Sequence, residues 1–271
     1  NYYQLSYAKN KVKTYHFLDS LYLDFAAKAT RKFELGETNY LEMITAKSKQ
    51  KQLETSYNQA LQEVVFSSEE LKAVVQIDSL LILDQPLQKL EIETITTKDN
   101  LGLQYFDNEK NYQQALTQKE KQSLLPDISL EYFQGTNSQL NTNINGYQFG
   151  LKIPLLFSGN ASKIKASKIA HEIVVEQKAS YKIKLEGHYK SLLATLKQYE
   201  EALSYYENEG KNLKNEIIKT ANRTYKEGEI DFFQYIQSLE TAKDIELNYL
   251  ENLNAHNQTV ININHLILNT F

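Results

Sequence analysis

The chain has 271 residues, enough for one or two ordinary domains, with 41% apolar and 24% charged residues. Its net charge of −4, without a dominant basic block, gives nucleic-acid binding little support. The absence of cysteine excludes disulfides, thiolate metal sites and cysteine nucleophiles, and no run approaches the about 18 apolar residues of a transmembrane helix.

The first third of the chain has the spacing of helices. Apolar residues recur every three or four positions through residues 1–34, and a second helical run extends from about 38 to 75. Gly36 lies between them, and so short a turn forces the two helices to be antiparallel. Residues 77–100, with Pro86, predict an irregular packed connector. A third helix is expected over 101–124, ended by Pro126.

The residues after Pro126 change to a period of two. Large apolar side chains alternate with polar ones in residues 127–133 and again in 147–153. These apolar residues are Ile128, Leu130, Tyr132, Tyr147, Phe149, Leu151 and Ile153. The intervening stretch 135–146 is polar and rich in turn-forming residues, so the sequence predicts a β-hairpin. Because two strands bury little surface alone, we expect them to join strands from elsewhere.

The helical period returns after the expected hairpin. It runs from Ser158 to about Lys226, which corresponds to roughly 100 Å of helix at ~1.5 Å per residue. Gly187 and Gly210 lower the helix propensity and are expected to mark bends. After Gly228, a last helical arm is expected to continue to about residue 269.

One passage occurs twice. Residues 31–41 recur as 223–233, shifted by 192 positions, and a repeat at this distance predicts a duplicated domain half. The same offset relates further pairs: Ile44 and Ile236, Lys51 and Lys243, Tyr57 and Tyr249. Residues 80–192 have no counterpart. The simplest interpretation is that the first copy has lost its front end and that the chain is one end of a longer protein.

The residues that carry most enzyme and metal chemistry do not cluster in this sequence. None of the histidines pair at i,i+4, and we expect them to be polar residues of the surface or of a tunnel lining rather than metal ligands. They are His16, His171, His188, His256 and His265. There is no Ser-His-Asp grouping, no glycine-rich phosphate loop and no HExxH motif. The sequence therefore predicts no catalytic residue, no metal site and no cofactor.

The order of these elements resembles the TolC family of outer-membrane efflux channels. Residues 33–36 and 225–228 match the family's aromatic-x-x-Gly tip motif. Residues 125–130 resemble the entry to a barrel strand, and 150–159 resemble the strand exit. The composition, rich in Asn, Lys, Tyr and Ile, resembles versions from Bacteroidetes heavy-metal RND efflux systems, in which this module can follow the pump in one polypeptide.

The resemblance implies a mainly α fold of very long antiparallel helical hairpins, an α-barrel or coiled-coil tunnel, with one β-hairpin contributing to a trimeric transmembrane β-barrel. Along the chain, 1–76 would be the first-repeat helical hairpin with its tip at Gly36, and 77–125 the connector and helix. Residues 126–157 would be the outer-membrane β-hairpin, and 158–271 the second-repeat long hairpin with its tip at Gly228.

The resemblance also implies a function. Members of the family are homotrimers of the cell outer membrane that extend into the periplasm. They accept substrates from an inner-membrane RND pump held by a periplasmic adaptor, so this chain would export metal ions or small toxic compounds without catalysis or a cofactor. Its partners would be the adaptor, the pump and outer-membrane lipid.

Three groups of residues follow from that function. The adaptor or pump would dock on the tips, at Gly36, Tyr40, Leu41, Gly228, Phe232 and Phe233. The apolar residues after each glycine are expected to be exposed, and this is more exposed apolar surface than a solvated turn needs. A tunnel-entrance charge would come from Glu37, Glu42, Glu229 and Asp231. The seven alternating apolar residues between 127 and 153 would face lipid.

Departures from the family pattern and other interpretations remain. Only one β-hairpin is present, and the aspartate that often lies six positions past the tip glycine is Glu42 or Gln234 here. The glycine turns could be plain connectors, and the apolar row could face a soluble core. The alternative functions are a periplasmic adaptor, which should have β-rich halves flanking a single hairpin, and a coiled-coil scaffold, which leaves the strands without a purpose.

Overall fold

The computed structural model of the chain describes residues 1–79, 87–93, 100–137, 142–153 and 157–268. Parts of the expected connector (80–86 with Pro86, and 94–99), of the hairpin loop (138–141) and of the strand exit (154–156 with Pro154) lie outside the described residues. The chain divides into two compact units. The first comprises Asn1–Glu93 and Lys190–Asn264, and the second comprises Thr94–Tyr189 and His265–Phe271.

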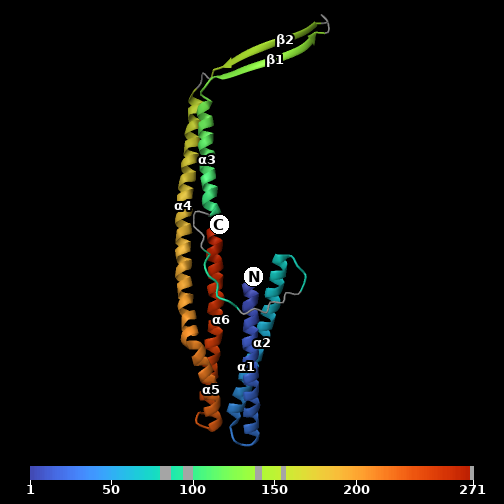
Figure 1. Ribbon diagram of the computed structural model, residues 1–271, viewed down its shortest axis with the longest axis vertical. Coiled ribbons are helices and arrows are strands. Elements are labelled where there is room, and N and C mark those ends of the chain that lie inside the picture. Colours follow the sequence, from blue (N-terminus) through green and yellow to red (C-terminus); the bar gives the residue numbers. More distant parts are fainter. Residues whose placement is uncertain (80–86, 94–99, 138–141, 154–156, 269–271) are drawn as a thin grey trace. The chain divides into compact units, whose positions relative to one another are not determined.

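The first unit begins with an antiparallel pair of helices, α1 (Tyr2–Glu34) and α2 (Tyr40–Val75), which run side by side in Figure 1. Their predicted boundaries are confirmed to within two residues. The small side chains of Ala26 and Ala29 on α1 and Ala46 on α2 are all buried in one cluster. Because the separation of packed helices depends on the side chains between them, these alanines allow α1 and α2 to approach closely.

The second helical arm is built from α4 (Phe157–Tyr205), a π-helical turn (Tyr206–Gly210), α5 (Lys211–Glu227) and α6 (Phe232–Leu268). The long helix predicted from 158 to 226 is therefore present, interrupted by the π-helical turn that ends at Gly210. Gly187, in contrast, lies inside regular helix. The first unit includes this arm from Lys190 to Asn264.

The larger core of the first unit joins α1 to α5 and α6. Aromatic and aliphatic side chains from the three helices, with Ala46 and Leu53 of α2, are buried together. The buried members include Leu18, Tyr22, Phe25, Ala221, Phe232, Tyr235, Ile236 and Leu239. A smaller cluster brings Tyr7 of α1 against Leu203, Leu250 and Leu253. The two helical arms of this unit are thus held together by a shared apolar core.

Asparagines on α6 hold the described part of the connector. Asn257 accepts a hydrogen bond from the Leu90 amide at 2.9 Å and donates one to the Gln88 carbonyl at 2.7 Å. Asn264, two turns further along, accepts from the Glu93 amide at 3.1 Å. Asn257 is fully buried, and its side chain satisfies backbone groups that have no secondary-structure partner in this irregular segment. Over 87–93 the connector is thus irregular and held against α6 by these two asparagines.

The second unit packs α3 (Leu101–Gln122) against the first part of α4, as Figure 1 shows. Asn160 donates to the Ser123 carbonyl at 3.3 Å, and the hydroxyls of Thr117 and Ser167 lie 2.7 Å apart. Further along, Lys178 forms an ion pair with Asp107. These contacts pair rising numbers on α4 with falling numbers on α3, so the helices are antiparallel. Helix α3 ends two residues earlier than predicted.

The predicted β-hairpin is confirmed. Strands β1 (Asp127–Asn137) and β2 (Thr142–Lys152) pair antiparallel, from Asp127 opposite Lys152 to Asn137 opposite Thr142. Both strands are longer than predicted, because the backbone ladder continues through the polar residues that the sequence suggested were loop. Among the described helices, none is both long and apolar enough to cross a bilayer.

Candidate functional site

The two glycine turns share one backbone geometry. Gly36 has φ 74° and Gly228 has φ 75°, in the left-handed region that disfavours side chains. In the first turn, the Gly36 amide donates to the Phe33 carbonyl at 3.0 Å, and the amide of residue 37 donates to the carbonyl of residue 32 at 2.8 Å. The second turn repeats these bonds at the 192-residue offset, at 3.3 and 2.9 Å. Both helices therefore end in the same glycine-dependent cap.

Each turn is followed by the same helix start. Asn39 accepts from the Glu42 amide at 2.9 Å, and its amide group donates back to the Glu42 carboxylate at 3.3 Å. Asp231 accepts from the Gln234 amide at 2.7 Å, and the Gln234 side chain accepts from the Asp231 amide at 3.0 Å. Asp231, expected only as an entrance charge, thus also caps α6, while Glu42 binds the side chain of Asn39, the cap residue of α2. The spacing of a capping residue and Glu or Gln three places on could have revealed this.

The apolar residues after the two glycines are not equivalent. Tyr40 and Leu41 are each 61% exposed and Phe233 is 54% exposed, as expected of docking residues. Phe232 is only 3% exposed, so the expectation that it is exposed is wrong. Its ring lies against that of Phe25 on α1, with centroids 5.3 Å apart. The neighbouring helical arm therefore covers Phe232 and makes it part of the core.

An aromatic cluster ties the two turns together. The ring of Phe25 also contacts Tyr225 and Tyr235, with centroids 5.9 and 4.8 Å away. Lys32, just before the first turn, places its ammonium 4.8 Å from the centre of the Tyr225 ring, which precedes the second turn. Burial raises the pKa of the Tyr225 hydroxyl, and the nearby Glu42 carboxylate raises it further. The two turns are therefore direct neighbours.

The entrance charges lie around these turns in different environments. Glu37 and Glu229 follow the glycines and are exposed, as is Asp231. Glu42 is half-buried and accepts a hydrogen bond from the Thr38 hydroxyl. The structure thus places all four carboxylates at the two turns: two as free surface charges, Asp231 as the cap of α6, and Glu42 bound to the side chain of the cap residue Asn39.

A second polar contact between the arms lies deeper, at Glu240 of α6. Its carboxylate accepts from the Tyr22 hydroxyl at 3.1 Å and forms ion pairs with Lys243 and, at 3.6 Å, with Lys49. Burial alone would raise the pKa of Glu240, but the hydrogen bond and charge of Lys243, with Lys49, lower it. Since Tyr22 and Lys49 belong to α1 and α2, this one carboxylate joins both helices of the first arm to α6.

The β-hairpin presents one apolar face. Ile128 is opposite Leu151, Leu130 is opposite Phe149, and Tyr132 is opposite Tyr147, and directly opposed residues share a face. These six side chains are between 55% and 78% exposed, and Ile153, just beyond β2, is also exposed. The other face carries mainly polar residues and glycines. Its apolar members are Ile144, opposite Gly135, and Phe133, whose ring fills the space that a side chain at Gly146 would occupy.

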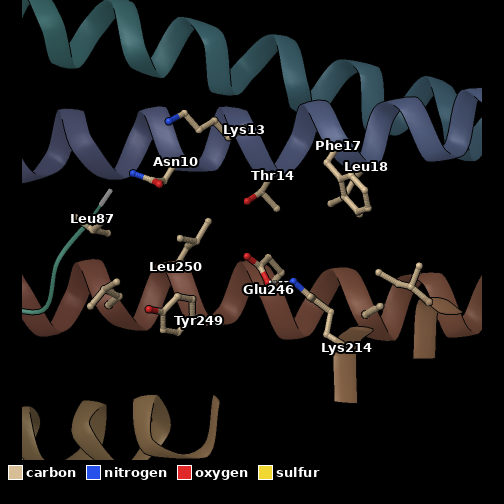
Figure 2. Close-up of a pocket in the computed structure, with 13 residues that line it drawn as sticks. Asn10, Lys13, Thr14, Phe17, Leu18, Leu87, Lys214, Glu246, Tyr249 and Leu250 are labelled. Atoms are coloured by element: carbon tan, nitrogen blue, oxygen red, sulfur yellow. Dashed lines mark hydrogen bonds and ion pairs between the residues drawn. The ribbon is translucent and has the colours of Figure 1, made fainter. Parts of the chain in front are cut away.

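A cavity of about 500 Å³ lies between α1 and α6 in the first unit. In Figure 2, Asn10 and Thr14 of α1 face Glu246 and Leu250 of α6 across it. The Glu246 carboxylate is already bound by Lys214 and by the Tyr206 hydroxyl, each at 2.7 Å. Because these polar groups are paired and the remaining walls are largely apolar, the cavity resembles a packing gap more than a built polar site.

The histidines do not gather into a ligand set. Among the residues that the structure describes, no three His, Asp or Glu side chains lie close enough to hold a metal ion. His256 is 1% exposed, so the expectation that it is a polar residue of the surface or of a tunnel lining is wrong. Its Nδ1 lies 3.3 Å from Asn257 Oδ1, and burial lowers its pKa. It therefore supports the connector contact as a neutral imidazole.

Comparisons with solved structures identify the fold. The chain is similar to CusC, described for folding and transmembrane channel formation, with a TM-score of 0.85 and 12% identity over 99% of this chain and 66% of that one. It is similar to the outer membrane protein VceC of Vibrio cholerae (0.83, 11%, 98% and 67%) and to the MtrE outer membrane channel of Neisseria gonorrhoeae in its open state (0.80, 13%, 99% and 64%).

These similarities extend along nearly all of this chain, which spans about two thirds of the length of the solved chains. No protein-family profile and no curated protein sequence matches the chain. The fold is that of the TolC-like outer-membrane efflux channels, as the sequence resemblance implied. The mainly helical architecture with one antiparallel β-hairpin is therefore confirmed.

Proposed function

We propose that this chain, which has the fold of the TolC-like channels, is the greater part of a channel subunit of a tripartite efflux system. Three such subunits form a homotrimer in the cell outer membrane, which extends into the periplasm and carries out no catalysis. The chain would consist of four segments: helical hairpins at 1–76 and 158–271, a connector and helix at 77–125, and a barrel hairpin at 126–157.

The single observation that carries this proposal is the apolar face of the β-hairpin. Six large side chains on one face of a two-stranded sheet are more than half exposed. Two strands cannot support so much exposed apolar surface in water, whereas lipid covers such a face at no cost in hydration. A barrel completed by strands of other copies would satisfy the strand edges and leave this face toward lipid. This observation also favours a channel over an adaptor or a scaffold.

The turns are the proposed docking surface. Tyr40 and Leu41 at the first turn, and Phe233 at the second, are exposed beside rigid helix ends. Apolar and aromatic anchors on a rigid frame are where interface energy concentrates. A periplasmic adaptor or an RND pump, whether separate or fused ahead of this module, would engage these residues. The buried Phe232 would instead hold the turn in position.

The substrates that we propose are metal ions and small toxic compounds of positive charge. Glu37, Glu42, Glu229 and Asp231 place four carboxylates at the paired turns of one chain. In a trimer these would form a ring of negative charge at the tunnel entrance, which attracts cations and repels anions. No resident cofactor or metal is required, because the chemistry is electrostatic selection along a conduit.

Complementation tests the function directly. The complete gene would be expressed with its adaptor and pump in a bacterial host that lacks its own outer-membrane efflux channel. We expect restored tolerance to metal ions and cationic dyes, and loss of that tolerance in a Tyr40→Ala, Leu41→Ala double variant. Val65→Ala with Phe66→Ala, also exposed and on α2, is the matched control. A channel that inserts but transports equally well with either double variant would contradict docking at the turns.

A further inference from the structure

Five lysines gather where α3 and α4 meet the β-hairpin. We refer to them as the basic collar: Lys119, Lys121, Lys163, Lys165 and Lys168. The stretches 119–121 and 157–168 that contain them include a single acidic residue, Glu120. The chain as a whole has a net charge of −4, so this local excess of positive charge runs against its overall balance.

The basic collar is free to meet an external anion. All five side chains are exposed, and none forms an ion pair with another described residue. Several lysines elsewhere form ion pairs, as in Lys11 with Glu63 at 2.9 Å and Lys72 with Glu69 at 2.8 Å. The five charges of the collar therefore do not stabilise the fold through ion pairs.

The collar lies within a short distance of the hairpin. Asn160 and Ser123 join the ends of α3 and α4 at 3.3 Å, so the lysines on both helices share one level. Lys121 is one residue from the end of α3, and Lys168 is eleven residues into α4. At ~1.5 Å per residue, the most distant lysine is roughly 17 Å along its helix from the hairpin base. Long lysine side chains shorten this distance further.

A shallow groove between α3 and α4 adds directed hydrogen-bond donors. It has a volume of about 360 Å³ and is lined by Lys110, Lys121, Lys168 and His171, with Glu172 as its one acidic member. Ammonium groups converging on one hollow suit a phosphate group, whose oxygens accept several hydrogen bonds at once. The groove therefore fits a phosphate headgroup better than a neutral one.

Polarity changes in a fixed order from hairpin to helices. The apolar face of β1 and β2 is followed by Leu125, 63% exposed, and Ile153, 54% exposed, and then by the basic collar. A bilayer has the same order, with a hydrocarbon core about 30 Å thick and headgroup layers that bring the total to about 40–45 Å. The collar is thus at the level at which lipid phosphates would lie.

We propose that the basic collar binds the phosphate groups of anionic phospholipids in the leaflet nearest the helices. This inference rests on the proposed function, since the hairpin must enter a bilayer for the collar to reach its surface. Attraction between exposed charges fades over about 8–10 Å at physiological salt, so the collar lysines nearest the hairpin base respond most strongly to anionic headgroups, and lysines further along the helices respond less. The collar fixes the depth of insertion and recruits a shell of anionic lipid.

The test measures lipid preference of the complete protein in vesicles of phosphatidylcholine containing spin-labelled phosphatidylglycerol or spin-labelled phosphatidylcholine. One variant carries Lys→Gln at all five collar positions. A matched control carries Lys→Gln at five exposed lysines further along α4 and α5: Lys184, Lys190, Lys197, Lys211 and Lys219. We expect the unaltered protein and the control to prefer the anionic label about fivefold at low salt, and the collar variant to lose that preference.

The outcomes separate the inference from the function on which it rests. Raising the salt to about 0.5 M should abolish the preference of the unaltered protein, as screening requires. Protein that inserts and conducts ions, but retains the preference without the collar lysines, would overturn the collar alone. An equal loss in the control variant would overturn it as well, since net charge would then be the cause. Protein that neither restricts labelled lipid nor conducts would contradict the proposed function and the collar with it.

Discussion

Replacing Phe232 by alanine should destabilise the first unit, whereas the same change at Phe233 should not. The Phe232 ring is 3% exposed and packs on Phe25, while Phe233 is 54% exposed at the next position of the same helix. Transfer of a fully buried Phe side chain to water costs about 1.5–3 kcal/mol. The cavity left behind adds about 24 cal/mol per Å³, or up to ~2 kcal/mol for a ring of about 100 Å³.

The expected loss is therefore about 3–5 kcal/mol for Phe232→Ala, against at most ~0.5 kcal/mol for Phe233→Ala. Amide hydrogen exchange resolves this difference locally, because it reports the opening of α5 and α6 separately from the second unit. Exchange of the most protected amides near the turn should accelerate by roughly 100-fold or more in the first variant and by less than about threefold in the second. Equal protection in the two variants would show that burial by α1 does not hold this turn in place.

Three further substitutions follow from the site. Leu130→Arg or Leu151→Arg should cost about 2–4 kcal/mol of insertion free energy at mid-bilayer, measured by folding into vesicles, while Ser129→Arg and Gln148→Arg should be tolerated; equal sensitivity on both faces would argue for a soluble core. Neutralising Glu37 and Glu229 should reduce the cation selectivity of the reconstituted channel without loss of stability. Asp231→Ala should reduce selectivity too, and should also lower the free energy of unfolding by about 1 kcal/mol because it removes the α6 cap. Unchanged selectivity in both variants would identify the turns as plain connectors. The pKa of Glu240 is lowered in the folded chain, so its ionised carboxylate should stabilise the fold fully above the ordinary pKa of 4.5. This stabilisation should be lost as the pH falls through the lower pKa of the folded chain. Denaturation curves of Glu240→Gln should therefore lack this part of the acid dependence of the unaltered protein.

The helical hairpins could be predicted from sequence because their signals are local. Gly36 and Gly228 stop helices whose apolar spacing is regular, so the boundaries followed to within a few residues. Alternation alone found both strands, but underestimated their length where polar residues continue the ladder to Asn137 and from Thr142. Local patterns thus predict where elements lie, while ladder pairing decides where they end.

The roles of individual residues at the turns depended on contacts that no local pattern contains. Tyr40 and Phe232 occupy equivalent positions in the repeat, yet one is exposed and the other is buried by Phe25, far away in sequence. The burial of His256 depends in the same way on a connector that packs against α6 from a distance. The helix caps are different, because Asn39 with Glu42 and Asp231 with Gln234 have the local spacing of a capping box.

The π-helical turn at Tyr206–Gly210 changes how the two halves of the chain correspond. A π-helical turn accommodates one residue more than the α-helix around it, and α1 is regular at the equivalent place. Upstream of the turn the offset between copies therefore becomes 191, which matches buried Leu5 with buried Leu196 and Tyr15 with Tyr206. The second copy thus has one residue more than the first at this place, and its helix accommodates that residue by widening rather than by rotating its apolar side away from the core.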